Sequence, residues 1–146
     1  MRWLVCAGRM DGLTAPAVPE ASRQSDDDAW VLLAEDDANL RNLLVLTVNE
    51  VTGLPVKAAC DGREALDLLA QSGPPALVLT DLMMPIVDGY GLLEAVRTSY
   101  SDMPVVAMSA ADSRARALAS GFDAYLVKPF ELEELCATLA RWVAVD

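Results

Sequence analysis

The residues of this chain that are best suited to chemistry are carboxylates that follow apolar runs. Glu35 and Asp36 come directly after the run Trp30–Ala34, and Asp81 follows a second run at residues 76–80. Carboxylates that gather at one point repel one another, and a hard cation with oxygen ligands, such as Mg²⁺, relieves that repulsion. A carboxylate that faces both a metal ion and a lysine can attack phosphorus and form an aspartyl phosphate.

A hydroxyl and an ammonium group follow two later apolar runs. Ser109 comes after residues 104–108, and Lys128 comes after residues 124–127. A lysine and a hydroxyl beside a carboxylate cluster can bind the oxygens of a tetrahedral anion. The chain contains no histidine. This absence excludes a Ser-His-Asp triad, a Cys-His pair, a histidine metal ligand and a phospho-histidine within this chain.

The elements that must position these residues can be assigned from periodicity. The apolar runs lack alternation, which is typical of strands buried on both faces of a sheet. Between the runs, apolar residues recur at helical spacing, and glycines mark several helix ends. The predicted strands are Trp30–Ala34, Val56–Ala59, Ala76–Thr80, Pro104–Met108 and Ala124–Val127; the predicted helices are Asn39–Thr52, a segment after Asp61–Gly62, one around Leu92–Val96, Asp112–Ser120 and a final one from Leu132 to Val143.

Strand and helix alternate five times, which predicts an α/β fold with a doubly wound parallel sheet and helices on both faces. Ligands of such sheets bind beyond the carboxyl ends of the strands. With the first, third and fourth strands as neighbours, we expect Asp36, Asp81, Ser109 and Lys128 to gather on one rim. We interpret Asp37 as a solvated helix cap and Asp88–Gly89 as a turn.

Composition narrows the range of partners. The 146 residues include 22 Asp and Glu against 11 Lys and Arg, for a net charge of −11. This balance argues against direct nucleic-acid binding and against docking on an anionic membrane. No apolar run reaches the ~18 residues of a transmembrane helix. The apolar stretch at the start of the sequence is also too short for a secretory signal peptide. Cys6, Cys60 and Cys136 show no paired spacing, which favours a reducing, cytoplasmic location, and we expect Cys60 and Cys136 in or near the core.

Residues 1–28 differ in character from the remainder. They are rich in Gly, Pro and small residues and end in three aspartates, with no persistent helix or strand period. We predict a flexible N-terminal leader over residues 1–28 and one folded domain over residues 29–146. A start codon assigned too early is an alternative explanation of the leader.

Five motifs fall in order at the predicted strand ends: Val31–Asp37, Asp61–Leu66, Leu79–Gly89, Met108–Ala110 and Tyr125–Phe130. With these motifs the chain resembles the receiver domain of two-component response regulators. The resemblance covers residues 29–146. It implies a flavodoxin-like (βα)5 fold with strand order 2-1-3-4-5.

The resemblance also implies a phosphoacceptor site with Mg²⁺ as its cofactor. Asp81 would take a phosphoryl group from a phospho-histidine of a kinase. Asp36 and Asp81 would bind Mg²⁺ directly, together with the backbone carbonyl of Met83. Glu35 would reach the metal ion through water.

Three further roles follow from the same resemblance. Lys128 would pair with a phosphoryl oxygen, and the peptide bond to Pro129 would be cis. The hydroxyl of Ser109 would move toward the phosphoryl group. Tyr125 would be the aromatic switch that turns inward with it, although a core tyrosine without a switching role explains the same residue. The spacing from Ser109 to Lys128 is shorter than in the family, so we expect a shortened loop or first helical turn after the fourth strand.

The implied function is signalling rather than enzymatic turnover, with the domain assisting its own phosphotransfer and dephosphorylation. The expected partners are a sensor histidine kinase or histidine phosphotransferase and a downstream protein, and the expected form is a single-domain regulator. One alternative is a receiver module of a larger hybrid kinase or multidomain regulator. A Mg²⁺-dependent phosphohydrolase is a second, but residues 35–38 lack its Asp-x-Asp spacing. An unphosphorylated adaptor is a third, against which the intact acidic pair, Asp81 and Lys128 argue.

Overall fold

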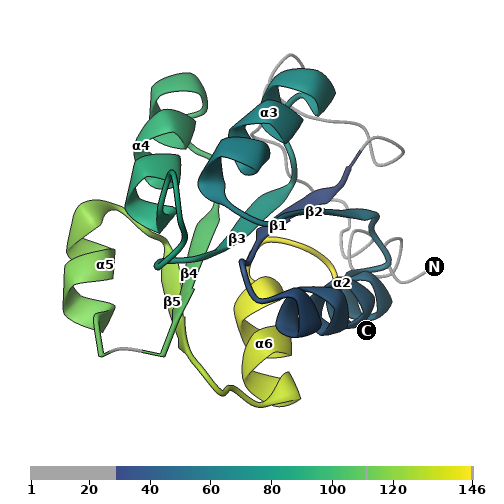
Figure 1. Ribbon diagram of the computed structural model, residues 1–146. Helices are drawn as coiled ribbons and strands as arrows, with labels where there is room; N and C mark the ends of the chain where they lie inside the picture. Colours follow the sequence, from purple (N-terminus) through teal and green to yellow (C-terminus); the bar gives the residue numbers. More distant parts are fainter. Residues whose placement is uncertain (1–28, 111, 146) are drawn as a thin grey trace, which may run out of the picture.

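The computed structural model describes residues 29–110 and 112–145 (Figure 1). The predicted leader at residues 1–28 therefore lies outside the described residues, as does Ala111. Strands and helices alternate along the described chain: β1 (Val31–Ala34), α2 (Ala38–Thr52), β2 (Val56–Ala59), α3 (Gly62–Ser72), β3 (Leu77–Asp81), α4 (Gly89–Ser99), β4 (Val105–Ser109), α5 (Arg114–Ser120), β5 (Ala124–Val127) and α6 (Leu132–Leu139). Among these residues, no helix is both long enough and apolar enough to cross a membrane.

The strands form one five-stranded parallel sheet in the order β2-β1-β3-β4-β5, which confirms the predicted topology. Every residue of β1, β3 and β4 is buried. Continuous burial explains why these strands read as unbroken apolar runs in the sequence. The register sets Ala34 opposite Thr80 and Asp81 opposite Met108, so the carboxyl ends of the three central strands lie side by side.

Helices cover both faces of the sheet (Figure 1). One buried cluster joins the sheet to α3, α4 and α5 through residues such as Leu69, Leu92 and Ala117. The other joins it to α2 and α6, where Val48 and Leu135 are central. This three-layer arrangement fixes the sheet while leaving the loops beyond the strand ends available for a site.

Aspartates begin three of the helices. The carboxylate of Asp37 accepts a hydrogen bond from the Leu40 N–H at 3.1 Å, which confirms Asp37 as the cap of α2. Asp61 caps α3 and Asp88 caps α4 in the same way. Such caps satisfy backbone N–H groups that the first helical turn leaves without partners.

Three expectations differ from the structure. Cys60 is exposed, so its predicted place in or near the core was wrong; it lies just after β2, where its backbone N–H bonds Glu64. Helix α6 ends at Leu139, although Trp142 and Val143 still pack on the core beyond it. Helix α5 begins at Arg114 rather than at residue 112 and has 7 residues, fewer than the other described helices.

Candidate functional site

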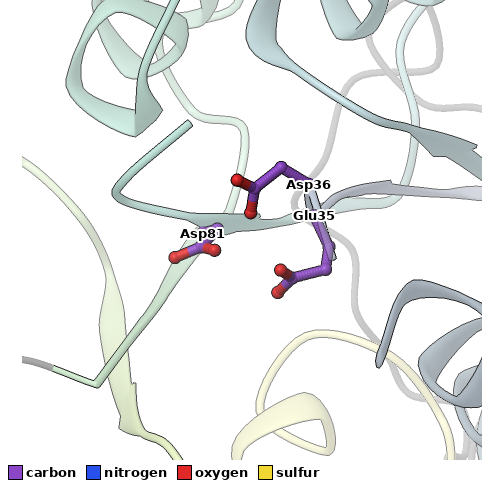
Figure 2. Close-up of side chains that lie close together, drawn as sticks. All are labelled: Glu35, Asp36 and Asp81. Atoms are coloured by element: carbon purple, nitrogen blue, oxygen red, sulfur yellow. The ribbon is translucent and has the colours of Figure 1, made fainter. Parts of the chain in front are cut away.

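Three carboxylates meet where β1 and β3 end. Oxygen atoms of Glu35, Asp36 and Asp81 all lie within 4.8 Å of one another. Figure 2 shows their side chains converging at the end of the sheet. Glu35 and Asp81 are buried, with 1% and 6% of their surfaces exposed, whereas Asp36 is exposed. The carboxylates therefore gather on one rim as predicted, with one exposed carboxylate beside two buried ones.

Lys128 bridges the two buried carboxylates. Its Nζ lies 2.8 Å from Oε1 of Glu35 and 3.0 Å from Oδ2 of Asp81. The cluster thus holds three carboxylates against one ammonium group that pairs with two of them, and it carries excess negative charge. Such an excess favours a divalent cation with oxygen ligands.

Burial and charge shift the acid–base behaviour of this cluster. Burial is the main cause that raises the pKa of Glu35, and the charge of Asp81 adds to it, although hydrogen bonds from Lys128 and Asp37 oppose the shift. Burial by itself lowers the pKa of Lys128, but its bonds to Glu35 and Asp81 outweigh burial and raise it. Lys128 is therefore held as a cation within the rim.

Ser109 is the last residue of β4, and Tyr125 lies within β5. Ser109 is buried, and its carbonyl accepts a hydrogen bond from the Lys128 N–H at 3.0 Å. The Tyr125 ring is buried as well, and its hydroxyl accepts a hydrogen bond from the Ser113 N–H at 3.1 Å, next to the start of α5. The Lys128–Pro129 peptide bond is cis, as expected. The loop before α5 is thus tied to the side chain that was predicted as a switch.

The loop after Asp81 packs tightly against the rim. A Cβ on Gly89 would lie 2.5 Å from the Asp81 carbonyl oxygen, so only glycine allows this approach. The Met83 N–H lies 3.4 Å from Oδ1 of Asp81, while the Met83 side chain is 70% exposed. Ile86 has φ of 71°, a left-handed conformation that is unfavourable for a β-branched residue. The tight packing of this loop holds the backbone beside Asp81 in place.

Two supporting residues were missed from the sequence. Arg41 donates hydrogen bonds to the carbonyls of Glu35 at 3.0 Å and Asp36 at 3.5 Å. The buried Thr80 hydroxyl donates to the Asp81 carbonyl at 2.9 Å. Both side chains bond backbone carbonyls. Every residue has such a carbonyl, so no pattern of side-chain types in the sequence predicts these contacts.

A comparison with protein families identifies this arrangement. Residues 31–140 match the family model described as the response regulator receiver domain. The chain belongs to the response regulator receiver family. The matched stretch contains both strand ends of the acidic cluster as well as Lys128, which places the rim inside the receiver domain of a two-component response regulator.

Curated relatives agree with this assignment. The response regulator MprA of Mycolicibacterium vanbaalenii is 42% identical over 112 residues, which are 75% of this chain and 48% of that protein. The MprA of Mycobacterium bovis is 41% identical over the same length. The chain therefore spans about half the length of the curated relatives it matches.

Solved structures show the same fold. The chemotaxis protein CheY4 of Vibrio cholerae superposes with a TM-score of 0.71 at 31% identity, covering 79% of this chain and 98% of that one. The response regulator TrrA of Thermotoga maritima, solved in complex with Mg²⁺-BeF, gives a TM-score of 0.71 at 27% identity, covering 79% of this chain and 99% of that one.

Proposed function

We propose that Asp81 accepts a phosphoryl group from a phospho-histidine of a partner protein. The observation that carries this proposal is the pairing of buried Asp81 with Lys128 at 3.0 Å inside a three-carboxylate cluster. Asp81 is the member of the cluster at the end of β3, where a ligand beyond the sheet edge is within its reach. These 146 residues contain no histidine, so the phosphoryl donor lies outside them.

The donor set fits Mg²⁺. Its members are carboxylate oxygens, the ligands that this hard cation prefers, and they lie within 4.8 Å of one another. We assign Asp36 and Asp81 as direct ligands together with the Met83 carbonyl, and Glu35 as a ligand through water. A bound Mg²⁺ supplies positive charge that offsets the negative charge of phosphoryl oxygens. The complex of TrrA with Mg²⁺-BeF supports this choice of metal.

The transfer uses the residues of the rim in distinct roles. An Asp81 carboxylate oxygen forms a bond to phosphorus as the phosphorus–nitrogen bond to the donor imidazole breaks, and the imidazole leaves with the electron pair. Lys128 exchanges its bond to the Asp81 carboxylate for one to a phosphoryl oxygen. The Ser109 hydroxyl donates to another phosphoryl oxygen. The domain thereby assists its own phosphorylation and, through water, its own dephosphorylation.

The signal is a change of shape that a second protein reads. Movement of Ser109 toward the phosphoryl group opens space beside Tyr125, whose hydroxyl bonds the Ser113 N–H at 3.1 Å. Rearrangement of Tyr125 therefore reaches the start of α5. We assign a sensor histidine kinase or histidine phosphotransferase as the donor and a downstream protein as the reader. The unpaired cysteine spacing favours a cytoplasmic setting.

Mass spectrometry tests the phosphoacceptor directly. The full chain is incubated with Mg²⁺ and acetyl phosphate, and we expect one added phosphate that hydroxylamine removes. The matched control is Asp81→Asn, which keeps the shape of the side chain but lacks the nucleophilic carboxylate. Phosphate on the Asn variant, or a hydroxylamine-stable product, contradicts the assignment.

A further inference from the structure

A wide apolar groove runs between α2 and α6. Its volume is about 890 Å³, and its lining includes Leu40, Leu43, Phe130, Leu132 and Cys136. Leu43 and Leu132 are 59% and 57% exposed. An exposed apolar groove of this size is typical of a binding site for another apolar segment.

The described part of the chain begins at Ala29, on the face of the sheet that carries the groove. Ala29 is buried in the cluster that contains Val48 of α2 and Leu135 of α6. Twenty-two residues separate Cys6 from Ala29. A random coil of 22 residues has an end-to-end distance of roughly 25 Å, and the 15 residues of α2 extend over about 22 Å. Residues near Cys6 can therefore reach the whole groove, and a tether this short gives them a high local concentration there.

Composition and charge make the first ten residues a suitable occupant. They contain the apolar run Trp3–Val5 between Arg2 and Arg9, and no acidic residue. Residues 29–146 contain 17 acidic and 8 basic residues, so the domain is strongly negative. Glu50 lines the groove itself. A basic, apolar segment is therefore attracted to an apolar groove in an acidic domain.

We propose that Trp3–Val5 docks in the groove between α2 and α6 of the same chain. The groove also contacts Lys128 and Pro129, so a docked segment lies beside the acidic rim. Any protein that binds this groove must then displace the segment first. This inference concerns occupancy of the groove and stands independently of the phosphoryl transfer proposed above.

Disulfide trapping tests the docking because each partner already carries a thiol. Cys6 follows the apolar run, and Cys136 lines the groove. A disulfide requires the two Cα atoms within about 7 Å. In a Cys60→Ser background of the full chain, the effective concentration of Cys6 toward Cys136 is measured by equilibration with reduced and oxidised glutathione. We expect a value at least tenfold higher in buffer than in denaturant.

Groove variants decide whether the apolar lining causes the enrichment. Leu43→Glu combined with Leu132→Glu should lower the effective concentration in buffer severalfold, to the level that the tether alone gives, while Leu118→Glu, which changes an exposed leucine of α5, should leave it unchanged. Because both groove leucines are exposed, the fold should persist, as thermal melting checks. Trp3→Ser with Leu4→Ser changes the segment alone and should have the same effect as the groove pair. Unchanged trapping in either variant, or a covalent dimer as the main product, overturns the proposal.

Discussion

Two charged clusters of the molecule differ in how their charges are balanced. One is the acidic rim, formed by Glu35, Asp36, Asp81 and Lys128, and the other is the Arg97 corner, formed by Arg97 and Asp123. At the rim, three carboxylates lie together, and the ammonium group of Lys128 pairs with two of them, Glu35 and Asp81. At the corner, the Arg97 guanidinium lies 2.9 Å from the Asp123 carboxylate and also donates to two backbone carbonyls.

The corner has the features of a structural contact. Asp123 also accepts a hydrogen bond from the Val105 N–H at 2.9 Å, which ties the start of β4 to the start of β5. Each charge there has partners of opposite sign or polarity, so the corner stabilises the fold. The rim keeps surplus negative charge, which repulsion makes unfavourable. The side chains of the corner are also more exposed, at 27% for Arg97 and 37% for Asp123, against 1% for Glu35 and 8% for Asp81. The difference teaches that buried carboxylates with unbalanced charge, the feature of the rim alone, are what suit a cation-binding site.

Removing the nucleophile should have the largest effect. Asp81→Asn should abolish phosphorylation by acetyl phosphate, because the amide cannot attack phosphorus. The loss of one of three clustered carboxylates relieves repulsion, so the fold should remain intact. Phosphate incorporation and a melting curve measure the two outcomes. If phosphorylation continues at the original rate, the rim is not the acceptor site and the comparison fails.

Metal ions should stabilise the rim and leave the corner unaffected. Ligand linkage predicts a gain of roughly 1–3 kcal/mol at saturating Mg²⁺. Asp36→Ala should remove this response and raise the melting temperature without metal, because it removes repulsion. Thermal melts with and without Mg²⁺ measure both effects. A melting temperature of the unmutated protein that is independent of Mg²⁺ contradicts the proposed site.

Truncation at the corner should give the reverse pattern. Arg97→Ala should reduce the free energy of unfolding by about 2 kcal/mol, because it removes hydrogen bonds to a charged group and leaves Asp123 without its cation. Phosphorylation and the response to Mg²⁺ should stay unchanged. Urea unfolding gives the first quantity and mass spectrometry the second. Loss of phosphorylation in a folded Arg97→Ala protein shows that the two regions are coupled.

The rim could be predicted from the sequence and the corner could not, for a physical reason. Rim residues follow short buried strands, and a parallel sheet brings such positions together by topology alone. Arg97 meets Gly121 and Asp123 through side-chain reach across α4 and the turn before β5. Nothing in a single helical arginine indicates which distant carbonyl it will bond.

Local reasoning failed where a turn overrides composition. Cys60 was expected near the core because cysteine behaves as a small hydrophobe. In the structure its backbone N–H donates to Glu64 at 2.7 Å in the connection before α3, and this turn leaves Cys60 exposed. The end of α6 was misplaced because Trp142 and Val143 continue the apolar stripe and pack on the core without continuing the helix.

The rate at which the aspartyl phosphate hydrolyses tests the role of Met83, an uncharged residue beside Asp81. The Met83 side chain is exposed beside Asp81 and cannot bond a water molecule that attacks phosphorus. Met83→Asn adds a polar group that can orient that water, and we expect severalfold faster phosphate loss. Ala111 stands two residues after Ser109, as Met83 stands two residues after Asp81, and it is the other side chain that we expect to flank the approach of this water. Ala111 lies outside the described residues. Equal decay rates in a time course show that these side chains do not control hydrolysis.

The smallest expected effect concerns Glu64, a carboxylate near the site whose partners are backbone groups. Its bond from the Cys60 N–H is the main cause that lowers its pKa below the ordinary 4.5. A lowered pKa in the folded state means that ionised Glu64 stabilises the fold above about pH 4.5, and that this contribution is lost as the pH falls through the lowered value. Glu64→Gln tests this contribution, because it keeps an acceptor for the bond and removes only the charge.

Because Glu64 is largely solvated, the Glu64→Gln variant should be less stable than the unmutated protein by no more than about 1 kcal/mol at pH 7, with the difference shrinking below pH 4.5. Glu64→Ala is the matched control, since it also removes the acceptor and should stay less stable at every pH. Urea unfolding of the three proteins from pH 7 to pH 4 measures the trend, and a Gln difference that grows on acidification would place Glu64 with the repelling carboxylates of the rim.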